Sequence, residues 1–173
     1  MDIMLDLETL GTGPEAVIIA IGAVAFTPTG LGETYYDTIA PQSAVDLGME
    51  IDASTVMWWM RQSDAARAAF ARPGKPILEV LRSFSLWMDK FHGEADVWGN
   101  GAAFDNVVLS SAYRRAKQPR PWSYKADRCY RTLKELYPFV KPVDVGTAHN
   151  ALDDAKAQAL HCSTLLRTAG VWK

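Results

Sequence analysis

The sequence predicts an α/β fold in which a mixed central sheet, three antiparallel strands followed by parallel ones, is flanked by helices. Three strand-like apolar runs come first, and their short connections favour antiparallel pairing. Segments with helical periodicity then alternate with short strand-like runs, as in parallel sheets covered by helices. No internal repeat or low-complexity linker interrupts the 173 residues, so we expect a single domain over residues 1–173.

Strand signals dominate the N-terminal part of the chain. Apolar runs predict strands over residues 2–8, 16–26 and 32–39, and TPTGLG between the last two is typical of a hairpin turn. Helices are expected at 52–62 and 63–71. Pro76 then opens a third helix, whose apolar stripe consists of Ile77, Val80, Leu81, Phe84, Met88 and Phe91.

Strands and helices alternate in the C-terminal part. ADVWG predicts a fourth strand and KADRCY a short fifth one, with a helix at about residues 105–117 between them. RTLKELY predicts another helix. The final helix carries an apolar stripe, expected to face the core, of Ala151, Leu152, Ala155, Ala159, Cys162 and Leu166.

The composition is that of an ordinary globular protein, with 49% hydrophobic and 22% charged residues. There is no apolar run of about 18 residues and no secretory leader, so we expect a cytoplasmic protein. Cys129 and Cys162 lack the spacing of zinc ligands and fit reduced thiols. His92 and His161 are interpreted as structural.

The net charge of −2 is unevenly distributed along the chain. Residues 1–60 contain nine acidic residues and no Lys or Arg, whereas residues 113–141 contain nine basic residues against Asp127 and Glu135. An acidic half that collects cations and a basic half that tracks phosphates would together fit a nucleic-acid strand. A solvated helix face rich in Lys and Arg remains the alternative.

Asp6 and Glu8 lie two residues apart in the first predicted strand. Residues at this spacing point to the same side of a strand, about 6.5 to 7 Å apart. Paired carboxylates repel each other and are costly to bury, which indicates either open solvent or bound cations such as Mg²⁺ or Mn²⁺. An exposed acidic strand edge is the simpler alternative for such a pair taken alone.

Three further polar residues lie at predicted strand and helix boundaries. Asp105 is at a strand-to-helix junction, where ligands gather in open sheets, although it could instead cap the helix. His149 precedes the final helix and Asp154 lies just inside it, free of the apolar stripe and directed toward the adjoining cleft. Asp153 is turned away by about 100° and is assigned to solvent or capping.

Together these residues resemble the motifs of the DEDDh group of 3′-5′ exonucleases, which includes proofreading subunits, oligoribonuclease and ribonuclease T. Asp6-Leu7-Glu8-Thr9 resembles the first motif, Phe104-Asp105 the second, and the spacing from His149 to Asp154 the third. The segments MLDLETLGTGPEAVIIAIGAV, MWWMRQS, VWGNGAAFDN and HNALDDAKAQA are also similar to phage and prophage exodeoxyribonuclease VIII-like exonucleases. The likeness runs from about residue 3 to residue 166.

This resemblance implies a ribonuclease H-like fold and a two-metal mechanism. The expected activity is hydrolysis from the 3′ end of single-stranded nucleic acid, with release of nucleoside 5′-monophosphates. DNA is favoured over RNA as the substrate. Asp6, Glu8 and Asp154 would hold the Mg²⁺ or Mn²⁺ ion nearest the attacking water. Asp6 would bridge to a second ion supported by Asp105. His149 would act as general base, because histidine accepts and releases protons readily near neutral pH.

Substrate contacts are expected around the same motifs. The resemblance implies that Thr9 and Leu10 touch the terminal nucleotide, although Thr9 could instead satisfy its own turn. Phe104 could stack on a base or belong to the core. Of the adjacent Trp58 and Trp59, one should be buried while the other reaches the cleft, and Trp59 is the candidate contact. Several relatives form dimers, so a homodimer is compatible with the resemblance.

Three alternatives share this fold. The chain could be an exoribonuclease, or an inert nucleic-acid-binding module of a replication or recombination complex, which would be expected to have lost a ligand or the histidine. A ribonuclease H-type endonuclease would not require the Asp-x-Glu pair together with the His-x4-Asp motif.

Overall fold

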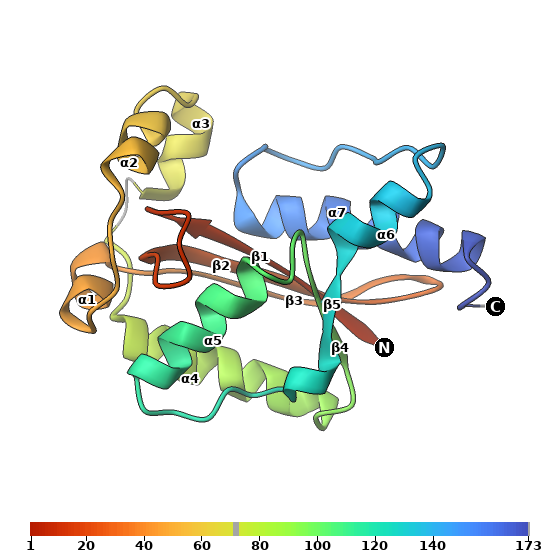
Figure 1. Ribbon diagram of the computed structural model, residues 1–173, viewed down its shortest axis with the longest axis horizontal. Coiled ribbons are helices and arrows are strands. Elements are labelled where there is room, and N and C mark those ends of the chain that lie inside the picture. Colours follow the sequence, from red (N-terminus) through yellow and green to blue (C-terminus); the bar gives the residue numbers. More distant parts are fainter. Residues whose placement is uncertain (71–72, 173) are drawn as a thin grey trace.

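A five-stranded mixed sheet forms the centre of the computed structural model, which describes residues 1–70 and 73–172 (Figure 1). The strands, in the spatial order β3-β2-β1-β4-β5, are β1 (Asp2–Thr9), β2 (Ile18–Thr27), β3 (Gly30–Thr38), β4 (Asp96–Gly99) and β5 (Asp127–Cys129). β1, β2 and β3 pair antiparallel, whereas β4 is parallel to β1 and β5 is parallel to β4. The predicted fold class is confirmed.

Helices cover both faces of this sheet. The α-helices in the described part of the chain are α1 (Pro41–Asp46), α2 (Ala53–Trp59), α3 (Asp64–Arg67), α4 (Ile77–Met88), α5 (Asp105–Arg115), α6 (Tyr130–Leu136) and α7 (Ala151–Thr168). α4 and α5 lie on one face and α6 and α7 on the other, with α2 and α3 beyond the C-terminal end of β1 (Figure 1). In the part of the chain described, none of the helices combines the length and apolar content needed to cross a membrane.

The two faces of β1 pack against different helices because successive side chains of a strand point to opposite sides. Leu5 and Leu7 join the core formed with α4 and α5, whereas Met4 joins a second cluster with α7. Asp6 and Glu8 follow Met4 by two and four residues, so their side chains point to the same side of the strand as that of Met4. Their side chains are therefore directed to the α7 side of the sheet.

A glycine in β2 allows α7 to begin directly on the sheet. A Cβ atom at Gly22 would lie 2.2 Å from the carbonyl carbon of Ala151, closer than any side chain could fit. Gly22 also pairs with Asp6 in the β1–β2 ladder. The first turn of α7, which carries Asp154, is thereby brought beside the carboxylates of β1.

The structure differs from the sequence prediction in several local elements. The prediction missed α1, a helix of six residues in which only Ala44 is buried, because so short a helix shows little apolar periodicity. The helices expected at 52–62 and 63–71 are the shorter α2 and α3 with a 3₁₀ turn at Ala68–Phe70, and residue 71 lies outside the described residues. The predicted hairpin is tight, since Thr27 pairs with Gly30.

Candidate active site

Three carboxylates from two elements converge beside the C-terminal half of β1. Asp6 and Glu8 come from the strand, and Asp154 comes from the first turn of α7. One oxygen atom of each lies within 4.8 Å of the other two. The structure therefore brings Asp154 of the C-terminal helix together with Asp6 and Glu8 of the first strand, on one side of the sheet.

The environment of these carboxylates disfavours their ionised forms. Burial raises the pKa of Glu8 to about 8, and the charges of Asp154 and Asp105 add to the effect. Burial also raises the pKa of Asp6 well above its usual range, and it raises the pKa of Asp154. Oε1 of Glu8 is buried and accepts no hydrogen bond from the described residues. Closely spaced carboxylate oxygens, one of which has no hydrogen-bond partner among the described residues, are suitable ligands for a hard divalent cation such as Mg²⁺ or Mn²⁺.

Asp105 reaches the site from the other side of β1. The β1–β4 ladder ends where Leu5 pairs with Gly99, and beyond it the backbone N–H of Leu7 donates to Oδ1 of Asp105 at 3.3 Å. Burial raises the pKa of Asp105 to about 7, although the Leu7 N–H opposes this shift. The N-cap residue of α5 is Phe104, so Asp105 does not have the capping role that was the alternative to metal binding. Asp105 lies outside the 4.8 Å cluster, but its charge raises the pKa of Asp6.

The loop before α7 is tied to the first turn of that helix. The backbone N–H of His149 donates to Oδ2 of Asp154 at 2.9 Å, and that of Thr147 donates to Oδ2 of Asp153 at 2.9 Å. Asn150 caps the helix, because its side-chain oxygen accepts hydrogen bonds from the backbone N–H groups of Leu152 and Asp153. His149 has a left-handed φ of 63°. Asp153, which the sequence assigned to solvent or capping, instead holds the loop, while Asp154 serves both the loop and the carboxylate cluster.

Gln158 is a site residue that the sequence analysis missed. Its Nε2 donates to Oδ1 of Asp6 at 2.8 Å, whereas its Oε1 is buried without a hydrogen-bond partner among the described residues. Gln158 follows Asp154 by four residues, and side chains at this spacing share one helix face. That spacing is the signal that could have identified it.

A pocket of about 450 Å³ adjoins the carboxylates. It is lined by Leu7, Glu8, Thr9, Gly11, Thr12, Ser54, Thr55, Trp58, Trp59 and Phe104. Thr9 is buried, and its hydroxyl donates to the carbonyl of Gly11 at 2.7 Å. This bond stabilises the local turn, which was the alternative to a substrate contact for Thr9. Leu10 lines a separate hollow, so the structure does not bring it into this pocket. Phe104 is half-buried and borders both the pocket and the core.

One of the two adjacent tryptophans of α2 is buried and the other is exposed, as their adjacency predicted. Trp59, the candidate contact, is 5% exposed, because its indole N–H donates to the carbonyl of Thr9 at 2.8 Å and its ring packs on Phe70. Trp58 is 41% exposed. Both line the pocket, but the larger exposed aromatic surface belongs to Trp58.

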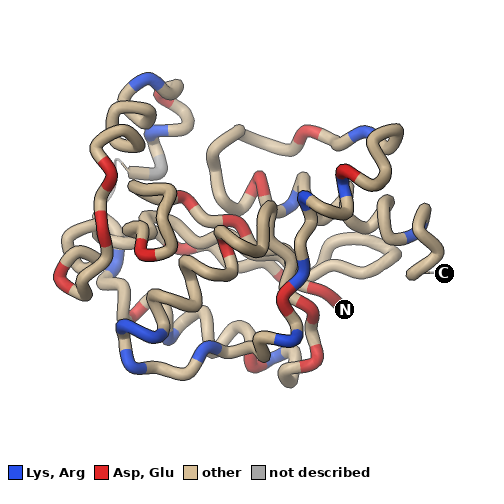
Figure 2. The backbone as a smooth tube through the Cα atoms, viewed as in Figure 1, with Lys and Arg blue, Asp and Glu red and all other residues tan. Residues whose placement is uncertain are grey.

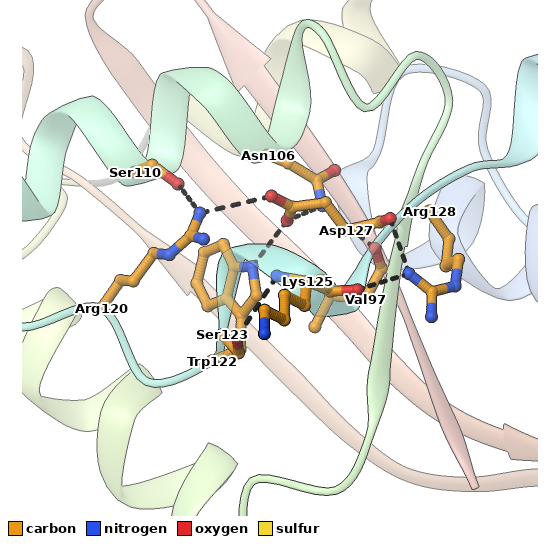
Figure 3. Close-up of polar contacts among 9 residues, drawn as sticks. All are labelled: Val97, Asn106, Ser110, Arg120, Trp122, Ser123, Lys125, Asp127 and Arg128. Atoms are coloured by element: carbon orange, nitrogen blue, oxygen red, sulfur yellow. Dashed lines mark hydrogen bonds and ion pairs between the residues drawn. The ribbon is translucent and has the colours of Figure 1, made fainter.

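The basic segment 113–141 is less available to phosphate than its composition suggested. Basic positions follow one another from the end of α5 through α6 (Figure 2). Four of the nine are in ion pairs, which are Arg114 and Arg115 with Glu15, Arg120 with Asp127, and Arg128 with Asp96. Asp127 also accepts from Asn106 and Trp122, so it organises a structural network (Figure 3). Arg131 lies close enough to Asp105 for its charge to lower the pKa of that carboxyl, and it donates to the carbonyl of Asn100 at 2.7 Å.

Comparison with protein families gives a match over nearly the whole chain. The model described as 3′-5′ exoribonuclease Rv2179c-like domain matches residues 1–166. Among individual proteins, the Exodeoxyribonuclease of Enterobacteria phage T4 is 23% identical over an alignment of 126 residues, with coverage of 65% of this chain and 56% of that protein. The chain thus matches little more than half the length of this relative.

Two solved structures that share this fold are nucleases. The nuclease domain of 3'hExo, a DEDDh family member bound to rAMP, superposes with a TM-score of 0.67 at 15% identity, covering 99% of this chain and 94% of that one. Exonuclease X in complex with 5′ overhanging duplex DNA gives a TM-score of 0.62 at 19% identity, covering 100% and 95%. At these identities the likeness establishes the fold.

Proposed function

Because this chain belongs to the family of 3′-5′ exoribonuclease Rv2179c-like domains, we propose that it hydrolyses phosphodiester bonds from the 3′ end of single-stranded nucleic acid with divalent metal ions. The observation that carries the proposal is the convergence of Asp6, Glu8 and Asp154 within 4.8 Å at the wall of a nucleotide-sized pocket. Glu8 belongs to both the carboxylate cluster and the pocket. A terminal nucleotide seated there would lie beside the metal ligands.

The residues divide the work in a way that follows from their chemistry. Asp6, Glu8 and Asp154 would hold one Mg²⁺ or Mn²⁺ ion, and Asp105 would support a second one shared with Asp6. Such a pair of ions, when bound, offsets the phosphate charge and stabilises the incoming and leaving oxygens of the displacement. His149 would accept the proton of the attacking water, so that a nucleoside 5′-monophosphate leaves the shortened strand.

The pocket can receive a nucleoside without reading its base. Trp58 and Phe104 provide apolar ring surface, and stacking on such rings tolerates every base. The hydroxyls of Thr12, Ser54 and Thr55 provide the polar part of the wall. Sequence-independent removal of terminal nucleotides is therefore expected.

For the polymer, single-stranded DNA is our first candidate and RNA the second. The T4 relative is an exodeoxyribonuclease, which favours DNA, whereas the description of the family is that of an exoribonuclease, which favours RNA. Two proteins of the same fold are known with DNA and with rAMP. The distinction depends on contacts to the 2′-hydroxyl, so both polymers must be compared directly.

The test uses 5′-labelled and 3′-labelled single-stranded DNA and RNA with Mg²⁺, Mn²⁺ or EDTA. Metal-dependent release of the 3′ label as a mononucleotide, with a shortening ladder from the 5′ label, is the expected result. Cleavage of a circular single strand would instead identify an endonuclease, because an exonuclease needs an end. Binding of either polymer without any cleavage would leave the inert binding module as the function.

A further inference from the structure

Trp58 of α2 touches two parts of the candidate site at once. It lines the pocket together with Glu8, and the residue is 41% exposed. Its ring centroid also lies 5.0 Å from that of His149, with an angle of 84° between the rings. One indole therefore borders the space for the terminal nucleotide and packs edge-to-face against the proposed general base.

The backbone of His149 is held more firmly than its ring. Its N–H is bonded to Asp154, and its φ of 63° is a conformation that a histidine adopts only when its surroundings impose it. Within residues 1–70 and 73–172, no hydrogen bond to either ring nitrogen is found. The orientation of the ring consequently depends on the aromatic contacts with Trp58, at 5.0 Å, and Trp59, at 6.2 Å.

Trp58 is itself supported from the end of β1. Its ring centroid lies 5.0 Å from that of Trp59 at an angle of 78°. Trp59 is fixed by its hydrogen bond to the carbonyl of Thr9, immediately after Glu8 in the sequence. A continuous series of contacts thus runs from the strand that carries the metal ligands, through both indoles, to His149.

We propose that Trp58 is a positioning residue that orients the His149 ring, and that a nucleotide stacked in the pocket strengthens this role by covering the exposed indole. The proposal rests on the proposed exonuclease function. A base that stacks on the indole buries it and restricts its motion, which leaves the imidazole fewer orientations. The base of the terminal nucleotide would thereby help to align the group that accepts the proton.

Substitution of Trp58 tests this role by separating kcat from KM. Trp58→Leu removes both ring contacts, so we expect kcat at saturating Mg²⁺ and oligonucleotide to fall roughly 2- to 13-fold, the equivalent of one lost aromatic pair, while KM rises. Trp58→Phe should restore most of kcat. Met57→Leu is the matched control, because Met57 is exposed on the same helix and does not line the pocket. An increase in KM with unchanged kcat would overturn the positioning role.

A double-mutant cycle shows whether Trp58 acts through His149. In a His149→Asn background, Trp58→Leu should cause little further loss of kcat. An equal loss in both backgrounds would refute the proposal, since Trp58 would then act on the substrate alone.

A second readout does not depend on activity. The NOEs from the His149 ring protons to side chains other than Trp58 should change in the metal-free Trp58→Leu protein and stay the same in Met57→Leu, and an unchanged NOE pattern in Trp58→Leu would refute the orienting role. If the unsubstituted protein cleaves neither polymer, the proposed function fails, while these NOEs still decide whether Trp58 orients His149.

Discussion

Gln158 donates a hydrogen bond from Nε2 to Oδ1 of Asp6 at 2.8 Å, which links α7 to the central strand one helical turn beyond Asp154. α7 therefore contributes both a carboxylate and an amide that fixes a second carboxylate. The amide donates to one oxygen of Asp6, and such a contact sets the orientation in which the carboxylate meets a cation. Oε1 of Gln158, which has no hydrogen-bond partner among the residues that the structure describes, adds another acceptor to this buried polar region.

Replacing Gln158 by Leu should weaken the metal site without removing a ligand. Loss of such a supporting contact typically lowers metal affinity or activity about 10- to 100-fold. Mn²⁺ titration by calorimetry and the metal dependence of the rate measure the two effects. Gln42→Leu is the matched control, because Gln42 also donates to an aspartate but lies exposed on α1. Equal Mn²⁺ affinities for the original protein and Gln158→Leu would show that Asp6 needs no such support.

Asp6→Asn should abolish turnover while making the metal-free protein more stable. The substitution keeps the shape of the side chain and an oxygen that accepts from Gln158, but it removes a carboxyl group that is costly to ionise beside Glu8 and Asp105. We expect a stabilisation of about 1 kcal/mol, which in a chain of this size raises Tm without metal by about 2–4 °C. The rise in Tm that Mn²⁺ causes should disappear. Differential scanning calorimetry with and without Mn²⁺ measures both. Retained cleavage would exclude Asp6 as a ligand.

The stability of the metal-free protein should fall as the pH rises. The pKa of Glu8 is about 8 in the folded protein and near 4.5 as an ordinary carboxyl group, so the folded state holds an extra proton between these values. Stability that depends on this proton is present at acid pH and is lost as the pH rises through about 8. Mg²⁺ should therefore raise Tm more at pH 8 than at pH 5. Glu8→Gln provides the control, and an equally steep pH dependence in this variant would exclude Glu8 as the source.

The sequence was sufficient to predict the strands and the same-face geometry of Asp6 and Glu8, because both follow from a local period of two residues. The part played by Asp105 was not predictable in detail. It depends on where β4 stops pairing with β1, which leaves the N–H of Leu7 available. A helix boundary in the sequence carries no information about a bond to a residue 98 positions away.

The basic segment shows a second limit of sequence reasoning. Arg114 and Arg115 look free in the sequence, yet both pair with Glu15, which the fold brings from the N-terminal loop after β1. Composition gives the number of charges but not their partners. Likewise, adjacency required Trp58 and Trp59 to diverge, but only the position of the Thr9 carbonyl decides which of them is buried.

His149→Asn should separate proton transfer from metal binding. Asparagine tolerates the left-handed backbone at this position and keeps the N–H that donates to Asp154, so the carboxylate cluster should remain intact. Its amide cannot serve as a general base, and we expect kcat to fall by roughly 10²- to 10⁴-fold. Single-turnover kinetics measure the loss, and the Mn²⁺-induced shift in Tm should stay that of the original protein. If this shift disappears as well, His149 organises the metal site, and the proton must be accepted by another group.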